Sequence, residues 1–324
     1  MRPLTICKWF AALFLACGVH ASVIAQSYPA RTVRFIVPFP PGAGADTTVR
    51  LFTPKLADAL GQQFIVDNRA GAAGNIGAEA AARAAPDGYT FLVAPASLAS
   101  SQSMYKNLTF DLARDFTPVA MLGSAPFVLA IHPSIPAKTV RELIAYAKAN
   151  PGKLNFASTG VGGVNHLAGE LFKSMAGIDI VHVPYKGTST AIPDLIGGQV
   201  SMMFTSTLSS LPHVKAGRLR AIGISSDKRS LAAPDLPTIA ESGLPGYESA
   251  TWFALLAPTG TSRDTINLIN ATLARISVTP EIRDQLLAQG AEPQSPSPEQ
   301  VGAYVRSEVV KWAKVVTISG AKAE

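Results

Sequence analysis

Short apolar runs alternate with helix-like stretches along most of this 324-residue sequence. Most of the runs are continuously apolar, as strands are when both faces of their sheet are buried. Repetition of strand, helix and strand predicts parallel sheets covered by helices, and therefore an α/β fold. We expect strands at residues 33–37, 64–66, 90–94, 127–131, 154–157, 180–183, 201–204, 219–224 and 254–257, and helices at residues 47–60, 76–84, 140–149, 164–176 and 191–197.

The C-terminal third has a different pattern. Apolar residues at helical spacing predict an amphipathic helix over residues 266–276. A second helix is expected to begin after Ser297, because Pro298 suits the first helical position and Gln300 stands where a capping box requires it. Both helices should pack onto a sheet that the earlier strands form.

The number of strands favours two α/β lobes. We expect the chain to cross between them near residues 118–127 and near residues 219–224, where strands stand without a clear helix between neighbours. Lobe 1 would then comprise residues 26–124 and 223–324, and lobe 2 would comprise residues 125–222. A cleft between two such lobes is a common binding place for a small ligand.

The first 25 residues have the pattern of a secretory signal peptide. Two basic residues precede an apolar run over residues 9–19, and small residues end the segment at Ala25. An uncleaved anchor and a lipoprotein site at Cys17 are the alternatives. Both cysteines of the chain lie in this segment, so the exported protein would fold without disulfides.

Charge and aromatic content argue against a nucleic-acid partner. The formal net charge of +6 comes with no dense Lys and Arg cluster, and aromatic residues make up only 7% of the chain. A protein that binds nucleic acid needs a concentrated basic surface, and base stacking needs aromatic side chains.

A Gly-rich loop over residues 38–46 joins the first strand to a helix. Backbone N–H groups at such a helix start have no partner within the helix and suit an anion. Pro41, Gly42, Ala43 and Asp46 are therefore candidate binding residues, although Pro41 has no N–H to donate. Asp46 is suited to capping the helix, and alternatively to orienting the loop or accepting from a ligand.

Two later loops have the same strand-to-helix position. Ser158, Thr159 and Gly160 offer hydroxyls and flexible backbone for a carboxylate or phosphate, or form a plain turn. Nucleotide binding is rejected, because Asn165 stands where a dinucleotide fingerprint needs its third glycine. The third loop carries Tyr185 beside a lysine. If the three loops meet in one cleft, the combined positive electrostatic field of their helix starts would favour an anionic solute.

Familiar catalytic patterns are absent from the sequence. It has no Gly-x-Ser-x-Gly elbow, no zinc-protease helix motif and no P-loop. His166 and Glu170 are four residues apart and could be two metal ligands, but an ordinary polar helix face is the better interpretation. His182 lies in an apolar run and is expected in the core or at the cleft edge. No metal or cofactor is predicted.

Several motifs, taken in order, are similar to those of a known family. The chain resembles the substrate-binding proteins of tripartite tricarboxylate transporters, the Bug-type family, over essentially the whole segment after the signal peptide. The motifs are Tyr28-Pro29, Val37-Pro38-Phe39-Pro40, Asp87-Gly88-Tyr89-Thr90, Asn155-Phe156-Ala157-Ser158, the stretch from His166 to Phe172, His182-Val183-Pro184-Tyr185-Lys186-Gly187, Pro234-Asp235-Leu236-Pro237-Thr238, Trp252 and Ala257-Pro258-Thr259-Gly260.

The resemblance implies a type II periplasmic-binding-protein fold, in which two crossover strands join the lobes. It implies a monomer that captures a small carboxylate in the periplasm and delivers it to an inner-membrane permease. Family members bind acidic amino acids, dicarboxylates, citrate or nicotinate-like acids. One carboxylate would be held through Gly42, Ala43 and Asp46 and through Ser158, Thr159 and Gly160.

One position departs from the family pattern. Ala43 stands where the family usually has a second glycine, and Ala tolerates positive φ poorly. If that position needs positive φ, the loop must be reshaped.

The first hypothesis is a solute-binding protein without catalysis, whose cleft walls include Ser97, His166, Tyr185 and Thr205. A periplasmic partner of a two-component sensor is one alternative. A secreted serine hydrolase that uses His166 or His182 is another, disfavoured by the missing elbow motif.

Overall fold

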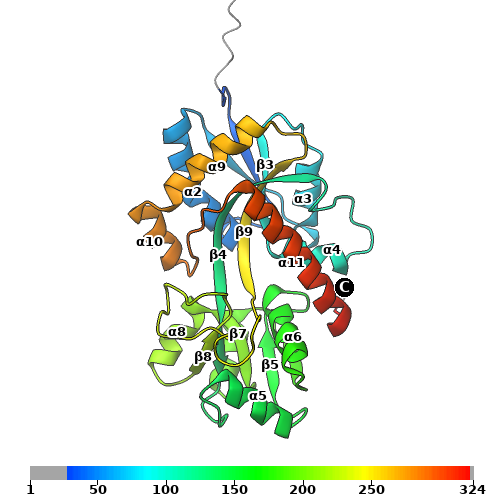
Figure 1. The fold of residues 1–324 in the computed structure, drawn as a ribbon, viewed down its shortest axis with the longest axis vertical. Helices are drawn as coiled ribbons and strands as arrows, with labels where there is room; N and C mark the ends of the chain where they lie inside the picture. The colour runs from blue at the N-terminus through cyan, green and yellow to red at the C-terminus, as the bar shows by residue number, and fades with distance from the viewer. Residues whose placement is uncertain (1–27, 322–324) are drawn as a thin grey trace, which may run out of the picture.

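The computed structural model describes residues 28–321, so the predicted signal peptide lies outside the described residues. Two α/β lobes are stacked along the long axis (Figure 1). The strands follow the order β2-β1-β3-β9-β4-β7-β5-β6, and β8 also pairs with β4. Their bounds are β1 Val33–Val37, β2 Phe64–Asn68, β3 Thr90–Pro95, β4 Phe116–Ile131, β5 Asn155–Ser158, β6 Val181–Pro184, β7 Met202–Ser206, β8 Arg220–Ile224 and β9 Ala250–Pro258.

Two long strands join the lobes. In lobe 1, β4 and β9 pair antiparallel along their length, and β9 also pairs with β3. The far end of β4 then enters lobe 2, where Phe127–Ile131 pairs with β7. The parallel strands β1, β2 and β3 complete lobe 1, and β5, β6 and β7 are parallel in lobe 2. The predicted α/β fold with two crossover strands is confirmed.

The predicted second crossing near residues 219–224 is wrong. Those residues form β8, which pairs with the lobe 2 end of β4, at Val128–Ile131. The second crossover strand is β9 instead. Both segments are largely apolar runs, and nothing within such a run specifies the strand that it will pair with. We infer from this pairing that lobe 2 continues to about Ser249 rather than ending at residue 222.

Helices cover both sheets. The helices expected at 140–149 and 164–176 have those bounds, and the capping box at Ser297 is present. Three helices were not expected, α4, α8 and α10; α4 is rich in serine, which is typical of loops and helix caps. The helix bounds are α2 Gly44–Leu60, α3 Asn75–Ala82, α4 Ser97–Met104, α5 Val140–Ala149, α6 Val164–Ala176, α7 Thr188–Ile196, α8 Thr207–Lys215, α9 Arg263–Ser277, α10 Pro280–Ala288 and α11 Pro298–Ser319. No helix within residues 28–321 is long and apolar enough to cross a bilayer.

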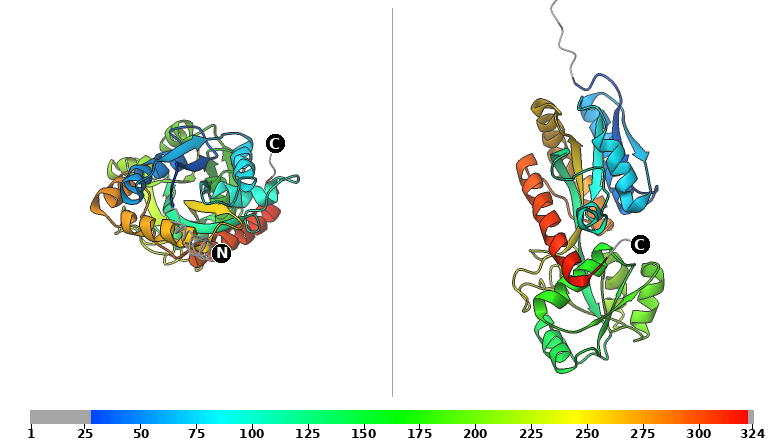
Figure 2. Two further views of the ribbon diagram at one scale, coloured as in Figure 1. Left: turned by 90° about the horizontal axis from the view of Figure 1, so that it is seen from above. Right: turned by 90° about the vertical axis from the view of Figure 1, so that its right-hand side faces the viewer.

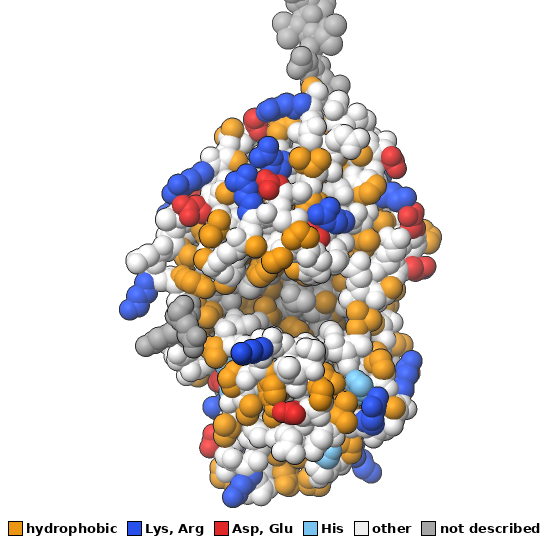
Figure 3. Space-filling view, turned by 180° about the vertical axis from the view of Figure 1, so that it is seen from behind, with side chains coloured by type: hydrophobic (Ala, Val, Ile, Leu, Met, Phe, Trp, Pro, Cys, Tyr) orange, Lys and Arg blue, Asp and Glu red, His pale blue; other side chains and the backbone are white. Residues whose placement is uncertain are grey.

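The last helix, α11, connects the two lobes. It runs down the molecule from lobe 1 to the edge of lobe 2, as the right-hand view of Figure 2 shows. Its buried residues Val315 and Val316 share one apolar cluster with Leu167 of α6, and Trp252 of β9 belongs to the same cluster. On the opposite side from this helix, the surface is hollowed between the lobes (Figure 3).

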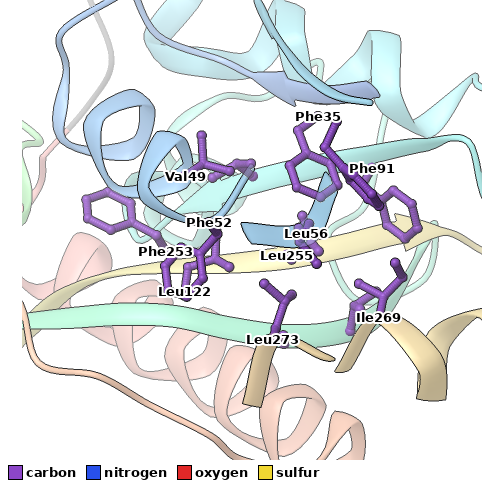
Figure 4. Packing of buried hydrophobic residues seen from close by; sticks show 14 of the residues in the cluster. Phe35, Val49, Phe52, Leu56, Phe91, Leu122, Phe253, Leu255, Ile269 and Leu273 are labelled. Atoms are coloured by element: carbon purple, nitrogen blue, oxygen red, sulfur yellow. The ribbon is translucent and has the colours of Figure 1, made fainter. Parts of the chain in front are cut away.

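Lobe 1 has a dense aromatic and aliphatic core. Phe35 and Phe91 from neighbouring strands meet edge to face, with ring centroids 5.7 Å apart. Phe52 and Leu56 of α2 pack on the same cluster (Figure 4). This core fixes α2 against its sheet, and so fixes the loop that precedes α2 at the lobe boundary.

Candidate ligand-binding site

A cavity of about 550 Å³ lies between the lobes. Lobe 1 and lobe 2 both contribute to its lining, which consists of apolar, hydroxyl and amide side chains. Among the described residues, no Asp, Glu, Lys or Arg side chain lines it. The lining residues are Phe39, Ala43, Gly44, Ala45, Pro95, Ser97, Phe127, Thr159, Val164, Asn165, Thr188, Phe204, Thr205, Ser206, Thr251 and Phe253.

Five helices begin at this cavity. The first residues of α2, α4, α6 and α7 line it, and so does Ser206, the N-cap of α8. The starts of α2, α6 and α7 have no side-chain cap. Because first-turn N–H groups have no acceptor within their own helix, they leave partial positive charge at the helix starts. The cavity can therefore attract an anion without a cationic side chain.

The loop before α2 has its positive φ at Gly42 (84°), whereas Ala43 has φ −68°. Ala in place of the family's second glycine therefore needs no reshaping of the loop. The Gly42 N–H donates to Asp46 Oδ2 at 2.9 Å, and the Ala43 N–H donates to Pro40 O at 3.2 Å. Of the predicted residues in this loop, Ala43 lines the cavity, while Pro41, Gly42 and Asp46 do not.

Asp46 is a loop anchor. Its side chain is buried and accepts hydrogen bonds from Gly42 N–H, Arg50 Nε and Asn68 Nδ2. Burial alone would raise the pKa of this carboxyl, but the hydrogen bonds from Arg50, Gly42 and Asn68 outweigh it and lower the pKa below its usual value. The carboxylate thus holds the loop in place and has its oxygens engaged within the protein.

Ser158 is engaged inside lobe 2. Its hydroxyl is fully buried, donates to Gly160 O at 3.1 Å, and accepts from Gly160 N–H. His182 Nε2 lies 2.6 Å from the same oxygen, and the tautomer of the imidazole sets which of the two groups donates. This pair has the distance of a nucleophile and its base, but Ser158 has no exposed surface for a substrate to reach. The structure therefore gives no support to the hydrolase alternative.

His166 and His182 stack beneath this loop, with ring centroids 3.9 Å apart. His166 Nδ1 accepts the Gly162 N–H at 3.0 Å, which supports the loop from below. Burial lowers the pKa of both imidazoles to about 4; the neighbouring His182 adds to the effect on His166, and Lys173 adds to that on His182. The pair is neutral at pH 7. Glu170 Oε1 lies 3.9 Å from His166 Nε2, and across residues 28–321 no three His, Cys, Asp or Glu side chains gather as a metal site requires.

Tyr185 does not line the cavity. Its hydroxyl donates to Asp194 Oδ2 at 2.7 Å, and its ring packs against the lobe 2 core. Burial, followed by the hydrogen bond to Asp194, raises the pKa of the phenol to about 12. Tyr185 thus ties its loop to α7.

Two hydroxyls in the lining have no partner. Thr205 Oγ1 in lobe 2 and Ser97 Oγ in lobe 1 are buried and make no hydrogen bond to any described residue. Thr205 is 2% exposed. A buried hydroxyl without a partner costs free energy, which is recovered if a ligand supplies the missing hydrogen bond. Both residues line the same cavity, Ser97 from lobe 1 and Thr205 from lobe 2.

Comparison with known proteins places the chain in a family. A model of the tripartite tricarboxylate transporter family receptor matches residues 48–320. Over 313 residues the chain is 39% identical to protein BugT of Bordetella pertussis (strain Tohama I), which covers 96% of both proteins. The chain belongs to the tripartite tricarboxylate transporter receptor family. The resemblance predicted from the motifs is confirmed.

Solved structures support the same assignment for this receptor. R. palustris Rpa4515 with adipate is 36% identical, with a TM-score of 0.72, over 91% of this chain and 99% of that one. MatC (Rpa3494) from Rhodopseudomonas palustris with bound malate is 33% identical, with a TM-score of 0.69, over 89% and 100% of the two chains. The type II fold and the assignment as a solute-binding receptor follow from this family.

Sequence reasoning missed the aromatic walls of this receptor. Phe127, Phe204 and Phe253 line the cavity from three different strands, and Phe39 lines it from the loop after β1. Three of them lie in or beside predicted strands, where an apolar residue indicates a buried core and not a cavity wall. Thr188 also lines the cavity. It directly follows a glycine in the third loop, and this position at a helix start is the sequence signal that could have identified it as a candidate.

The buried histidine pair should make the stability of the protein depend on pH. In the unfolded chain these imidazoles have the ordinary pKa near 6.5, above their folded pKa of about 4. The unfolded state therefore binds more protons between these values, so stability is retained above pH 6.5 and falls as the pH drops toward 4. Urea unfolding of this receptor at pH 7.0, 6.0 and 5.0 measures how steeply the free energy of unfolding changes with pH. The slope should decrease in His182→Gln and persist in His132→Gln, because His132 lies outside the cluster; equal slopes in both variants would contradict the assignment.

Proposed function

We propose that this receptor captures a small carboxylate in the periplasm and delivers it to the inner-membrane permease of a tripartite tricarboxylate transporter. The observation that carries the proposal is the pairing of uncapped helix starts with the partnerless hydroxyls of Ser97 and Thr205 in one interlobe cavity. A carboxylate accepts hydrogen bonds from amides and hydroxyls alike, and the helix dipoles favour its charge. The adipate and malate of the related structures are carboxylates, which supports the same ligand class here.

The amides available for this purpose are those of the first helical turns. The loop amides of Gly42, Gly160 and Gly162 are engaged within the protein. The N–H groups of Gly44, Ala45 and the first residues of α6 have no acceptor in the described part of the chain. We therefore expect the ligand to bind the amides of the first helical turns, and not those of the candidate residues Gly42 and Gly160.

Thr205→Val tests the proposal. Removing a hydroxyl that bonds the ligand should weaken carboxylate binding by about 1–3 kcal/mol, which is about 5- to 150-fold in affinity. The unliganded protein should be no less stable, since the substitution removes a buried group without a partner. Calorimetry with a panel of small organic acids measures the affinity, after a thermal-shift screen has found which acids stabilise the protein.

Thr317→Val is the matched control, because Thr317 is exposed on α11 away from the cavity. The Thr317→Val variant should bind the carboxylate with the same affinity as the unsubstituted protein. If no acid stabilises the protein while a neutral sugar does, the proposed function is wrong.

A further inference from the structure

Asn165 is the second residue of α6, and it lines the interlobe cavity. The residue is 6% exposed. A side-chain amide buried at a helix start needs partners for one carbonyl oxygen and for the two hydrogens of its NH2 group. The partners that the protein itself supplies therefore decide what Asn165 can offer a ligand.

The carbonyl end of this amide is held within lobe 2. Asn165 Oδ1 accepts from the Thr159 hydroxyl at 3.0 Å and from the Thr159 backbone N–H at 3.4 Å. A flipped amide would set its NH2 group against that N–H, so the observed orientation is the one that satisfies both groups. The backbone of Gly163 is close by, since a Cβ added there would lie 3.3 Å from Oδ1. The amide therefore has little room to turn.

The nitrogen end of the amide has no partner within the protein. Asn165 Nδ2 makes no hydrogen bond to any described residue, and it is not among the fully buried polar atoms that lack a partner. It therefore keeps contact with open space, and the cavity is open space that Asn165 lines. The backbone N–H groups of Val164 and Asn165 begin the same uncapped helix and have no acceptor in the described part of the chain. Three donors thus meet at one helix start, where the helix dipole favours negative charge.

We infer that Asn165 is a specificity-determining residue, whose Nδ2 donates a hydrogen bond to a carboxylate of the ligand. This inference rests on the proposed function. Because Thr159 occupies Oδ1, Asn165 presents only a donor to the cavity. A carboxylate oxygen accepts from this donor, whereas the NH2 group of a carboxamide would face it donor to donor. Asn165 therefore selects an acid over the corresponding amide.

Asn165→Asp tests this role with little change of shape. The aspartate keeps an oxygen for Thr159, replaces the free NH2 group by a second oxygen, and adds a negative charge beside the bound carboxylate. An acid should bind at least about 100-fold more weakly at pH 7, because a hydrogen bond is lost and like charges repel. Urea unfolding should show no loss of stability without ligand, because a negative charge in the first turn of a helix is favourable.

Asn165→Leu separates ligand binding from loop support. Leucine removes the donor without adding charge, but it also removes the oxygen that Thr159 needs. If Asn165 binds the ligand, the aspartate variant should have the lower affinity of the two. If Asn165 only supports its loop, the aspartate variant should have the higher affinity, because it keeps the bonds to Thr159.

Calorimetry measures these affinities with one acid, the one that stabilises the parent most in a thermal-shift panel of adipate, malate, citrate and nicotinate. The parent should bind the carboxamide of that acid at least about tenfold more weakly than the acid itself. Asn267→Asp is the matched control, because it makes the same chemical change at an exposed position of α9 outside the cavity lining. This variant should bind the acid as the parent does.

The outcomes distinguish this inference from the proposed function. Affinity in Asn165→Asp equal to or above that of Asn165→Leu would overturn the role of Asn165 and leave carboxylate capture standing. Equal binding of acid and carboxamide by the parent would do the same. Absence of binding to all four acids would overturn both proposals.

Discussion

Glu308→Ala should lower the free energy of unfolding by about 3–5 kcal/mol. Glu308 is 1% exposed, and its Oε2 accepts from Trp252 Nε1 and Trp312 Nε1, both at 2.9 Å. Its other oxygen pairs with Lys311 Nζ. Alanine would leave two buried indole N–H groups without their acceptor and would remove the carboxylate partner of Lys311, which keeps its hydrogen bond to Glu248 O. The loss should lie toward the lower end of the range, since Lys311 is partly exposed and can reach water.

Urea unfolding measures this loss, and Glu299→Ala is its control on the same helix. Glu299 makes an exposed ion pair with Arg263, and such pairs contribute at most about 1 kcal/mol. If the Glu308 and Glu299 variants lose the same amount, the buried network does not stabilise the protein as described. The result bears on the connection between the lobes, because Trp252 lies on crossover strand β9 and Trp312 lies on α11.

Asp46→Ala should weaken carboxylate binding by more than tenfold although Asp46 does not line the cavity. The substitution removes the acceptor of the Gly42 N–H and leaves Arg50 and Asn68 without their shared partner. Without this anchor, the loop that sets the start of α2 is free to move, and an anion site built from amides depends on their fixed positions. Stability should fall by about 1–3 kcal/mol, since the partly exposed Arg50 can be solvated.

Asp58→Ala on the same helix is the control, because Asp58 is exposed and far along α2 from the loop. It should change neither affinity nor stability appreciably. Calorimetry and urea unfolding of both variants supply the measurements. Parent-like affinity in Asp46→Ala would mean that the loop keeps its shape without the carboxylate. Because the folded pKa of Asp46 is lowered, its contribution is present at neutral pH and lost as the pH falls through that folded pKa.

Local chemistry made much of the fold predictable. The bounds of α5 and α6 follow from apolar periodicity and from turn residues at their ends, and β1 was predicted at the residues where it occurs. The strand-to-helix loops were identified for the same reason, since glycine and proline act within a few residues of their own position. The family resemblance depends on such short segments and was confirmed.

The candidate site was predictable only in part. Ala43, Ser97, Thr159 and Thr205 were expected and do line the cavity. Ser158 and Tyr185 were expected beside them, but their hydroxyls bond to His182 and Asp194 inside lobe 2. The direction in which a loop hydroxyl points depends on hydrogen-bond partners in distant strands and helices. The local sequence pattern is the same whether the hydroxyl lines the cavity or bonds within its lobe.

The sequence by itself determined where the strands and most of the helices lie, where glycine-rich turns open helices, and which family the chain resembles, because these depend on neighbours along the chain. Tertiary structure alone decided that β9 and not β8 crosses between the lobes. It also decided that four phenylalanines meet at one cavity, and that the hydroxyls of Ser97 and Thr205 are left without partners. The physical reason is that strand pairing and hydrogen-bond satisfaction are set by groups far apart in sequence, which become neighbours only when both sheets have formed.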